Sequence, residues 1–128
     1  ARPGDVLVVD AKGFMEAGPW GDVMTQQALQ IGLAGLVING AVRDASSIVE
    51  MGFPVFCLGL SIKSTGKNQR GRVNVPVCIG DVQVNPGDII VGDGGGELLH
   101  ELVVQGHRAV AVQPQRHGRL GAIVGERI

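Results

Sequence analysis

Residues 35–44, GLVINGAVRD, decide the fold, because they join a strand of the buried type to a charge pair at its carboxyl end. The apolar run predicts a strand over residues 35–39 that is covered on both faces, as strands of parallel sheets are. Position alone leaves two interpretations of Arg43 and Asp44 evenly balanced. Either Asp44 caps the following helix while Arg43 pairs on the surface, or both side chains belong to a site. In a site, the guanidinium would suit a carboxylate or enolate, and the carboxylate would suit Mg²⁺ or Mn²⁺.

Strand-like and helix-like segments alternate around this stretch. Apolar runs predict strands, and helical spacing closed by a glycine predicts helices. Such an alternation indicates right-handed βαβ crossovers and a mainly parallel sheet, and so an α/β fold. In chain order the predicted segments are strand 6–9, helix 22–32, strand 35–39, helix 44–50 and strand 54–58.

The second half of the chain has a different pattern of polar and apolar residues. Residues 61–72 are polar and predict a long loop with four basic residues and no acidic one, namely Lys63, Lys67, Arg70 and Arg72. Tight turns then separate short apolar runs, which predicts a β-meander. The runs cover residues 73–79, 82–84 and 89–91; residues 108–113 suggest another strand, and residues 98–106 fit either a helix or a strand.

Length, composition and net charge limit the classes of protein to which this chain can belong. The 128 residues suit a single domain over residues 1–128, and 45% apolar residues with 21 glycines exclude a disordered chain. Few aromatic residues and a net charge of −1 predict neither a nucleic-acid nor a membrane partner. The chain shows no long apolar run and no signal sequence, so we expect a cytoplasmic protein. Cys57 and Cys78 lie in apolar runs and are expected to be reduced core residues.

Two further segments are expected at the same edge of the sheet as the charge pair. The sequence GPWGD at residues 18–22 begins the first helix, so its amides could hold an anion, although Asp22 could equally be a helix cap. Lys67, after the third strand, could neutralise substrate carboxylates or simply be solvated. The glycines match no dinucleotide-binding or phosphate-loop spacing. The histidines match no metal motif and are given no function: His100, His107 and His117.

Four blocks in order resemble the RraA-like family: GDVLVVD, GLAGLVINGAVRD, GFPVFCLGLSIKSTGK and VNVPVCIGDVQVNPGDIIVGD. The resemblance covers residues 4–93. That family includes 4-hydroxy-4-methyl-2-oxoglutarate and 4-carboxy-4-hydroxy-2-oxoadipate aldolases, regulators of ribonuclease E activity, and proteins once described as menaquinone methyltransferases. The resemblance implies a swivelling β/β/α domain with parallel βαβ units and a β-meander. It also implies a homo-oligomer, a trimer or hexamer, with sites at subunit interfaces.

The resemblance implies a chemistry as well. Aldolase members use a divalent metal, Mg²⁺ or Mn²⁺, to cleave a 4-hydroxy-2-oxo di- or tricarboxylic acid by a retro-aldol reaction that releases pyruvate. They also decarboxylate oxaloacetate. Asp44 matches the metal-holding aspartate, Arg43 the arginine beside the pyruvyl oxygen, and Lys67 the lysine of a substrate loop. The segment that binds the pyruvyl carboxylate and positions a water matches Gly21, Asp22, Val23 and Met24, and the base is expected to be water or hydroxide.

Other functions stay open beside the aldolase. The regulator branch implies a non-enzymatic protein that binds a ribonuclease, and a structural oligomer with a decayed site is a third reading. The regulators lack the aspartate after the arginine, so Asp44 favours the enzyme. Three departures from the family pattern are expected to matter. Ser47 replaces an acidic residue, the family's amino-terminal part has no counterpart, and residues 95–128 form a divergent tail.

Overall fold

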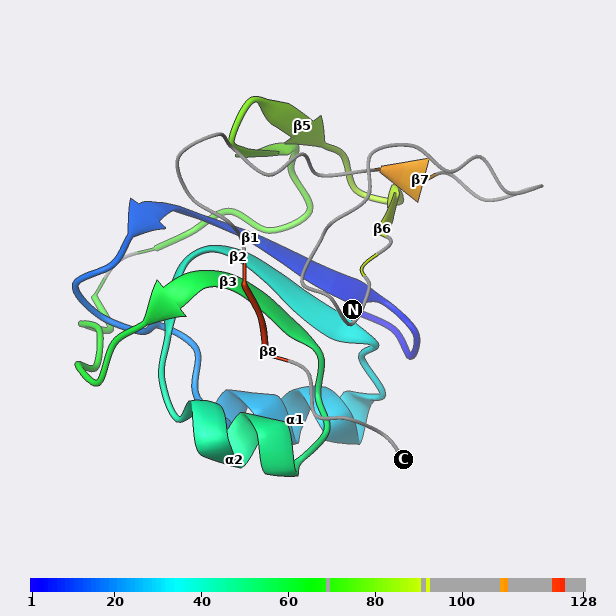
Figure 1. Ribbon diagram of the computed structural model, residues 1–128. Helices are drawn as coiled ribbons and strands as arrows, with labels where there is room; N and C mark the ends of the chain where they lie inside the picture. The colour runs from blue at the N-terminus through cyan, green and yellow to red at the C-terminus, as the bar shows by residue number, and fades with distance from the viewer. Residues whose placement is uncertain (69, 91, 93–108, 111–120, 124–128) are drawn as a thin grey trace.

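The computed structural model describes residues 1–68, 70–90, 92, 109–110 and 121–123 (Figure 1). Strands and helices alternate through the first half, which confirms the predicted α/β architecture. In these residues no helix is long and apolar enough to cross a membrane. The elements are β1 (Val6–Phe14), α1 (Asp22–Ile31), β2 (Gly35–Val42), α2 (Ala45–Glu50), β3 (Val55–Leu60), β4 (Val77–Ile79), β5 (Val82–Val84), β6 (Ile89–Ile90), β7 (Ala109–Val110) and β8 (Gly121–Ile123).

The main sheet has the strand order β1-β2-β3-β8 (Figure 1). Strands β1, β2 and β3 are parallel, with Val8 opposite Val37 and Val37 opposite Phe56, whereas β8 is antiparallel to β3. Helix α1 connects β1 to β2, and α2 connects β2 to β3, as the sequence predicts. The carboxyl ends of the three parallel strands therefore meet at one edge, on the left in Figure 1.

The two faces of β2 bury different side chains, because successive residues of a strand point to opposite sides. Leu36 and Ile38 pack on the side of the helices, in a cluster that includes Ile48 of α2. Val37, between them, packs on the other side against Val84 of the hairpin formed by β4 and β5. Figure 1 shows α1 and α2 below the sheet and this hairpin above it. The strand is thus covered on both faces, as expected from its apolar run.

Helix α1 ends where the sequence predicts. Gly32 takes the left-handed conformation with φ 83°, and its N–H reaches the carbonyl groups of Ala28 and Leu29. Glycine suits this position because it has no Cβ to clash in a left-handed turn. The amino end differs from the prediction, since Gly21 is the N-cap residue and no side chain caps the helix.

The predicted β-meander is only partly correct. Strands β4 and β5 form an antiparallel hairpin, but β6 pairs in parallel with β7. Strand β4 begins at Val77, and the preceding Val73 is 83% exposed, so no strand covers residues 73–76. The predicted strand over residues 108–113 contains β7, while its other residues, and residues 98–106, lie outside the described residues.

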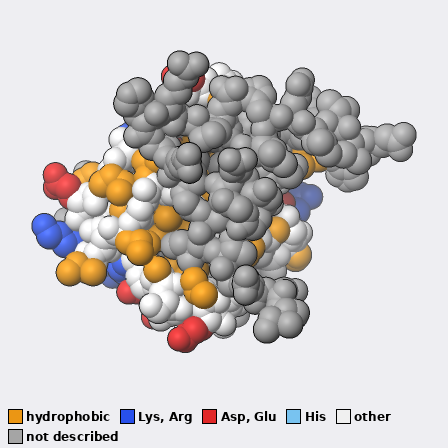
Figure 2. Space-filling view, viewed as in Figure 1, with side chains coloured by type: hydrophobic (Ala, Val, Ile, Leu, Met, Phe, Trp, Pro, Cys, Tyr) orange, Lys and Arg blue, Asp and Glu red, His pale blue; other side chains and the backbone are white. Residues whose placement is uncertain are grey.

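One cysteine prediction was wrong. Cys57 in β3 is buried, but Cys78 in β4 is exposed. The two-stranded β4–β5 sheet buries one face, through Ile79 and Val84, and so leaves alternate residues outside. Apolar side chains also reach the surface near the carboxyl edge of the main sheet, where Figure 2 shows them beside charged groups at the left; Leu60 and Ile62, at and after the end of β3, are among the exposed ones.

Candidate active site

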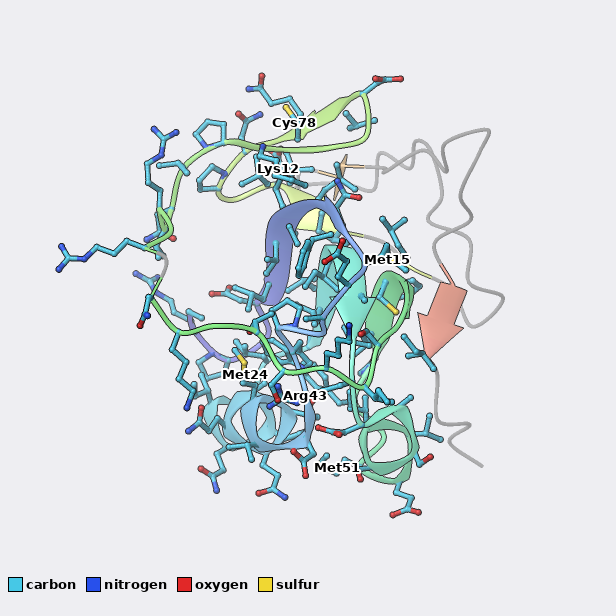
Figure 3. The ribbon with its side chains drawn as sticks, turned by 90° about the vertical axis from the view of Figure 1, so that its left-hand side faces the viewer. Lys12, Met15, Met24, Arg43, Met51 and Cys78 are labelled. Carbon is cyan, nitrogen blue, oxygen red and sulfur yellow. The ribbon has the colours of Figure 1, made fainter. Side chains whose placement is uncertain are left out.

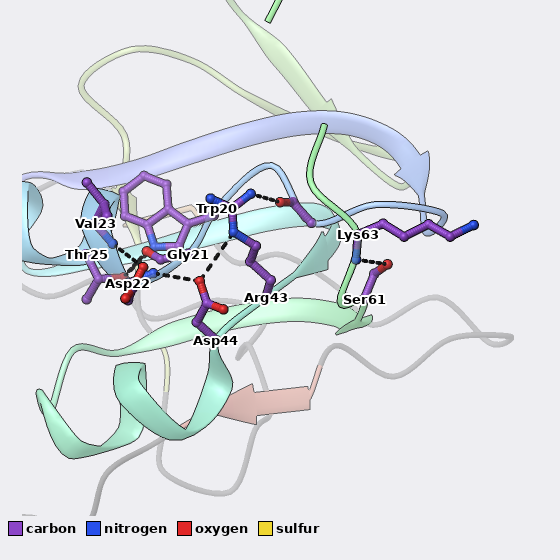
Figure 4. Close-up of polar contacts among 10 residues, drawn as sticks. Trp20, Gly21, Asp22, Val23, Thr25, Arg43, Asp44, Ser61 and Lys63 are labelled. Atoms are coloured by element: carbon purple, nitrogen blue, oxygen red, sulfur yellow. Dashed lines mark hydrogen bonds and ion pairs between the residues drawn. The ribbon is translucent and has the colours of Figure 1, made fainter. Parts of the chain in front are cut away.

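Asp44 joins β2 to α2 and holds an unusual backbone conformation. Its φ of 58° and ψ of 37° lie in the left-handed region, which costs a typical non-glycine residue about 1–2 kcal/mol. Its side chain makes no capping hydrogen bond to α2. Instead, Oδ2 accepts hydrogen bonds from the Asp22 N–H and from Arg43 Nε, both at 3.3 Å (Figure 4). Asp44 therefore occupies the N-cap position of α2, but its side chain does not cap that helix, because the carboxylate is directed at the amino end of α1.

Arg43 is fixed by a short backbone hydrogen bond, and its side chain makes two longer ones. Its N–H donates to the Trp20 carbonyl at 2.8 Å, and Nη1 donates to the Gly18 carbonyl at 3.4 Å. Figure 3, viewed onto the carboxyl edge, shows Arg43 beside the end of α1, with Met24 nearby. Its ion pair with Asp44 is long and partly exposed, with side chains 28% and 37% accessible. Such a pair contributes about 1 kcal/mol or less, so stability alone does not explain it.

The amino end of α1 completes the cluster. The Asp22 N–H faces Asp44, and the Val23 N–H donates to Oδ1 of the Asp22 side chain at 2.7 Å. No described residue accepts a hydrogen bond from the Met24 N–H. Two carboxylate oxygens thus already lie against the amides at the positive end of this helix. The segment is suited to receive the carboxylate of a ligand, provided that Asp22 moves aside.

Close approach of glycine backbones makes this geometry possible. A Cβ on Gly21 would lie 2.5 Å from Asp44 Oδ2 and 2.8 Å from Arg43 Nε, and a Cβ on Gly18 would lie 2.7 Å from Arg43 N. A second contact holds the segment in place, since the Gly18 N–H donates to the Lys63 carbonyl at 2.9 Å. Ser61 adds a bond from Oγ to the Glu16 carbonyl at 3.0 Å.

The structure brings together some predicted site residues and not others. Arg43, Asp44 and Asp22 converge, with Gly21, Val23 and Met24 beside them. Lys67 is exposed in the 61–72 loop, and no hydrogen bond or ion pair joins it to another described residue. Sequence reasoning missed Gly18, whose carbonyl contacts Arg43; the only signal was its place in the GPWGD stretch.

The carboxylates of Asp44 and Asp22 are oxygen donors of the kind that a hard divalent cation takes. Among the described residues no group of three His, Cys, Asp or Glu side chains could hold a metal. Mg²⁺ commonly takes only one or two protein carboxylates and fills its remaining positions with water and substrate oxygens. The cluster holds two carboxylates, Asp44 and Asp22, and one guanidinium, Arg43, which pairs with Asp44 alone, so its formal charge is −1. An anionic ligand would enter more readily with a cation beside Asp44.

Comparison with known proteins gives the relatives of this chain. The RraA-like family (aldolase/RraA) matches residues 1–98. A protein of Halalkalibacterium halodurans named "Putative 4-hydroxy-4-methyl-2-oxoglutarate aldolase" is 44% identical over 96 residues, which are 75% of this chain and 46% of that protein. The chain therefore spans about half the length of this relative.

Solved structures agree with the sequence match. A Geobacillus kaustophilus protein described as S-adenosylmethionine:2-dimethylmenaquinone methyltransferase superposes with a TM-score of 0.71 and 35% identity, over 73% of this chain and 58% of that one. The RNA-processing inhibitor RraA of Thermus superposes with a TM-score of 0.68 and 32% identity, over 72% and 57% of the two chains. The fold and the matched length together show that this chain belongs to the RraA-like family.

Proposed function

We propose that this chain carries the pyruvyl-binding site of a metal-dependent aldolase that cleaves a 4-hydroxy-2-oxo acid. The observation that supports the proposal most directly is the direction of the Asp44 carboxylate. It points away from its own helix and toward Arg43 and the amino end of α1. Relatives named as 4-hydroxy-4-methyl-2-oxoglutarate aldolases support the substrate class.

Binding would begin with the 2-oxo acid carboxylate. This group would replace the Asp22 side chain at the Val23 N–H and also reach the Met24 N–H. Both amides belong to a helix amino end, which favours an anion. The released Asp22 carboxylate would then be free to hold the water that accepts the 4-hydroxyl proton. Lys67, exposed in its loop, is our candidate for neutralising the distal carboxylate.

Bond cleavage would place charge where Arg43 lies. Loss of the 4-hydroxyl proton turns C4 into a carbonyl carbon, the C3–C4 bond breaks, and its electrons reach the C2 oxygen as the enolate of pyruvate. Protonation at C3 completes the product. The Arg43 guanidinium stabilises the oxygen as its charge develops, which is the kind of contact that lowers a barrier. A divalent cation held by Asp44 through its carboxylate and water would supply additional positive charge to the same oxygen.

The test is a pyruvate-release assay with Mg²⁺ and 4-hydroxy-4-methyl-2-oxoglutarate, which yields two pyruvates per molecule. We expect Arg43→Ala to lower kcat/KM by about 10²–10³, or about 3–4 kcal/mol. Arg43→Lys should recover only part of this, because an ammonium lacks the planar fork. Arg2→Ala, which removes an exposed arginine at the opposite end of the sheet, is the matched control and should have no effect. Equal rates in the wild type and Arg43→Ala, or turnover unaffected by chelation, would contradict the proposal.

A second function has support from the comparisons. The Thermus structure is described as an RNA-processing inhibitor, and the same fold could act by binding a ribonuclease. Asp44 favours the enzyme, because the resemblance associates the regulators with the loss of that aspartate. Absence of pyruvate release, together with retention of a ribonuclease on the immobilised chain, would support the regulator instead.

A further inference from the structure

Thr25 in α1 is the buried polar side chain of the described core, with 0% of its surface exposed. We propose that Thr25 is a positioning residue that orients the amides at the start of α1 toward Asp44 and the ligand. The inference rests on the proposed function, since it concerns the same site. Its experiment, however, includes a measurement that does not depend on activity.

The hydroxyl of Thr25 has a fixed direction. Trp20 Nε1 donates to Thr25 Oγ1 at 2.8 Å, and Oγ1 donates to the Gly21 carbonyl at 2.9 Å (Figure 4). A hydroxyl has one proton, so a hydroxyl that accepts from the indole and donates to the carbonyl has its direction set. The Gly21 carbonyl also accepts from the Thr25 N–H at 3.0 Å. It is therefore held by two hydrogen bonds from one residue.

The two hydrogen bonds from Thr25 fix the orientation of the peptide bond between Gly21 and Asp22. A trans peptide is planar, and its C=O and N–H point in opposite directions. Fixing the Gly21 carbonyl toward Thr25 therefore directs the Asp22 N–H the other way, toward Asp44 Oδ2, to which it donates at 3.3 Å. Thr25 reaches the Asp44 carboxylate through one rigid peptide plane, without touching it.

Trp20, which donates to the Thr25 hydroxyl, is itself fixed at the same edge of the sheet. Trp20 is 4% exposed, its ring stacks on Phe53 with centroids 6.2 Å apart, and its carbonyl accepts the Arg43 N–H at 2.8 Å. It also forms a parallel bridge with Val42 at the end of β2. The indole therefore holds the Thr25 hydroxyl in a fixed relation to the strand that carries Arg43. The network links both sides of the site through buried groups.

The decisive comparison is Thr25→Val against Thr25→Ser in the pyruvate-release assay. Valine keeps the shape but removes both hydroxyl bonds, whereas serine keeps them. We expect Thr25→Val to raise KM about 10-fold or more, with a smaller change in kcat, because the misplaced amides bind the ground state and transition state alike. Thr25→Ser should stay within about threefold of the wild type. Val55→Ala is the control for lost stability and should leave KM unchanged. Val55 is buried at the amino end of β3, the end opposite to the site.

Hydrogen exchange of the Asp22 and Val23 amides gives the readout independent of activity. Thr25→Val should accelerate exchange at these amides more than in β3, whereas Val55→Ala should not single them out. Trp20→Phe removes the donor to Oγ1 together with part of the ring that stacks on Phe53, and it should act in the same direction. It provides a second test if Thr25→Val does not fold. Unchanged KM and exchange in both variants, or an equal effect of Val55→Ala, would overturn the inference. A wild type without pyruvate release would refute the proposed function alone, and exchange would then decide the role of Thr25.

Discussion

At the scale of single residues, Asp44 combines a left-handed backbone with a carboxylate that is directed at the amino end of α1. Its left-handed conformation is one that glycine adopts more easily, and asparagine and aspartate more easily than alanine. This conformation turns the carboxylate toward Asp22 and Arg43 instead of α2. Strain of this kind is common where function needs a particular side-chain direction. Stability and activity should therefore respond differently to substitution here.

Three substitutions of Asp44 separate the two effects. Asp44→Gly should be more stable than Asp44→Ala by about 1 kcal/mol in unfolding free energy, because alanine keeps the left-handed strain. The glycine variant should therefore unfold at a higher temperature. Asp44→Asn should be close to the wild type in stability. All three should lose pyruvate release, since none retains the carboxylate. Thermal unfolding with the activity assay checks this, and an alanine variant as stable as the glycine variant would contradict it.

The two cysteines should react differently with a thiol reagent. Burial raises the pKa of the Cys57 thiol, against a smaller lowering by the Gly59 backbone, so this thiol stays protonated at pH 8. Cys78 is exposed on β4. Titration with a chromogenic disulfide at pH 8 should therefore modify Cys78 at once, and Cys57 only after denaturant is added. A Cys78→Ser variant that still reacts rapidly in the native state would contradict this assignment.

At the scale of elements, the site depends on the segment before α1 lying against the end of β2. Gly18 and Gly21 approach β2 and its charge pair too closely for a side chain, but they meet different atoms. A Cβ at Gly21 would meet side-chain atoms of Asp44 and Arg43, whereas one at Gly18 would meet backbone atoms of Arg43 and Val42. Side-chain ends can move aside more easily than the backbone of a buried strand.

This difference predicts opposite phenotypes for two similar substitutions. Gly21→Ala should lower kcat/KM by about 10² through displacement of the charge pair, with little loss of stability, since its φ of −152° suits any residue. Gly18→Ala should lower stability by about 1–3 kcal/mol, because the backbone must shift. Denaturant unfolding and the kinetic assay measure the two effects. A greater loss of stability in Gly21→Ala than in Gly18→Ala would contradict the prediction.

At the scale of the whole molecule, the sequence predicted the βαβ units because their signals are local. Apolar runs and Gly32 suffice to mark most of the first half. It could not predict that β6 pairs with β7 and not β5, because that pairing joins segments far apart in the chain. Nor could the sequence decide the role of Asp44, because a helix cap and a site residue look alike until the backbone conformation is known.

Assembly and metal binding stay predictions at this scale. Apolar side chains are exposed at the carboxyl edge, among them Leu60 and Ile62, and a homotrimer or hexamer would give them a partner. The chain spans about half the length of the Halalkalibacterium halodurans relative. Arg43, Asp44 and the start of α1 all belong to this chain, and our central claim is that together they bind an enolate.

Calorimetric titration with oxalate tests that claim most directly, because oxalate is a stable planar analogue of the pyruvate enolate and needs no turnover. We predict that the wild type binds oxalate in the presence of Mg²⁺ and loses this binding on chelation. Arg43→Ala and Asp44→Asn should each weaken the affinity about 10²-fold, as expected for an analogue of the charge-bearing state. Equal affinity in the wild type and both variants, with or without Mg²⁺, would contradict the account.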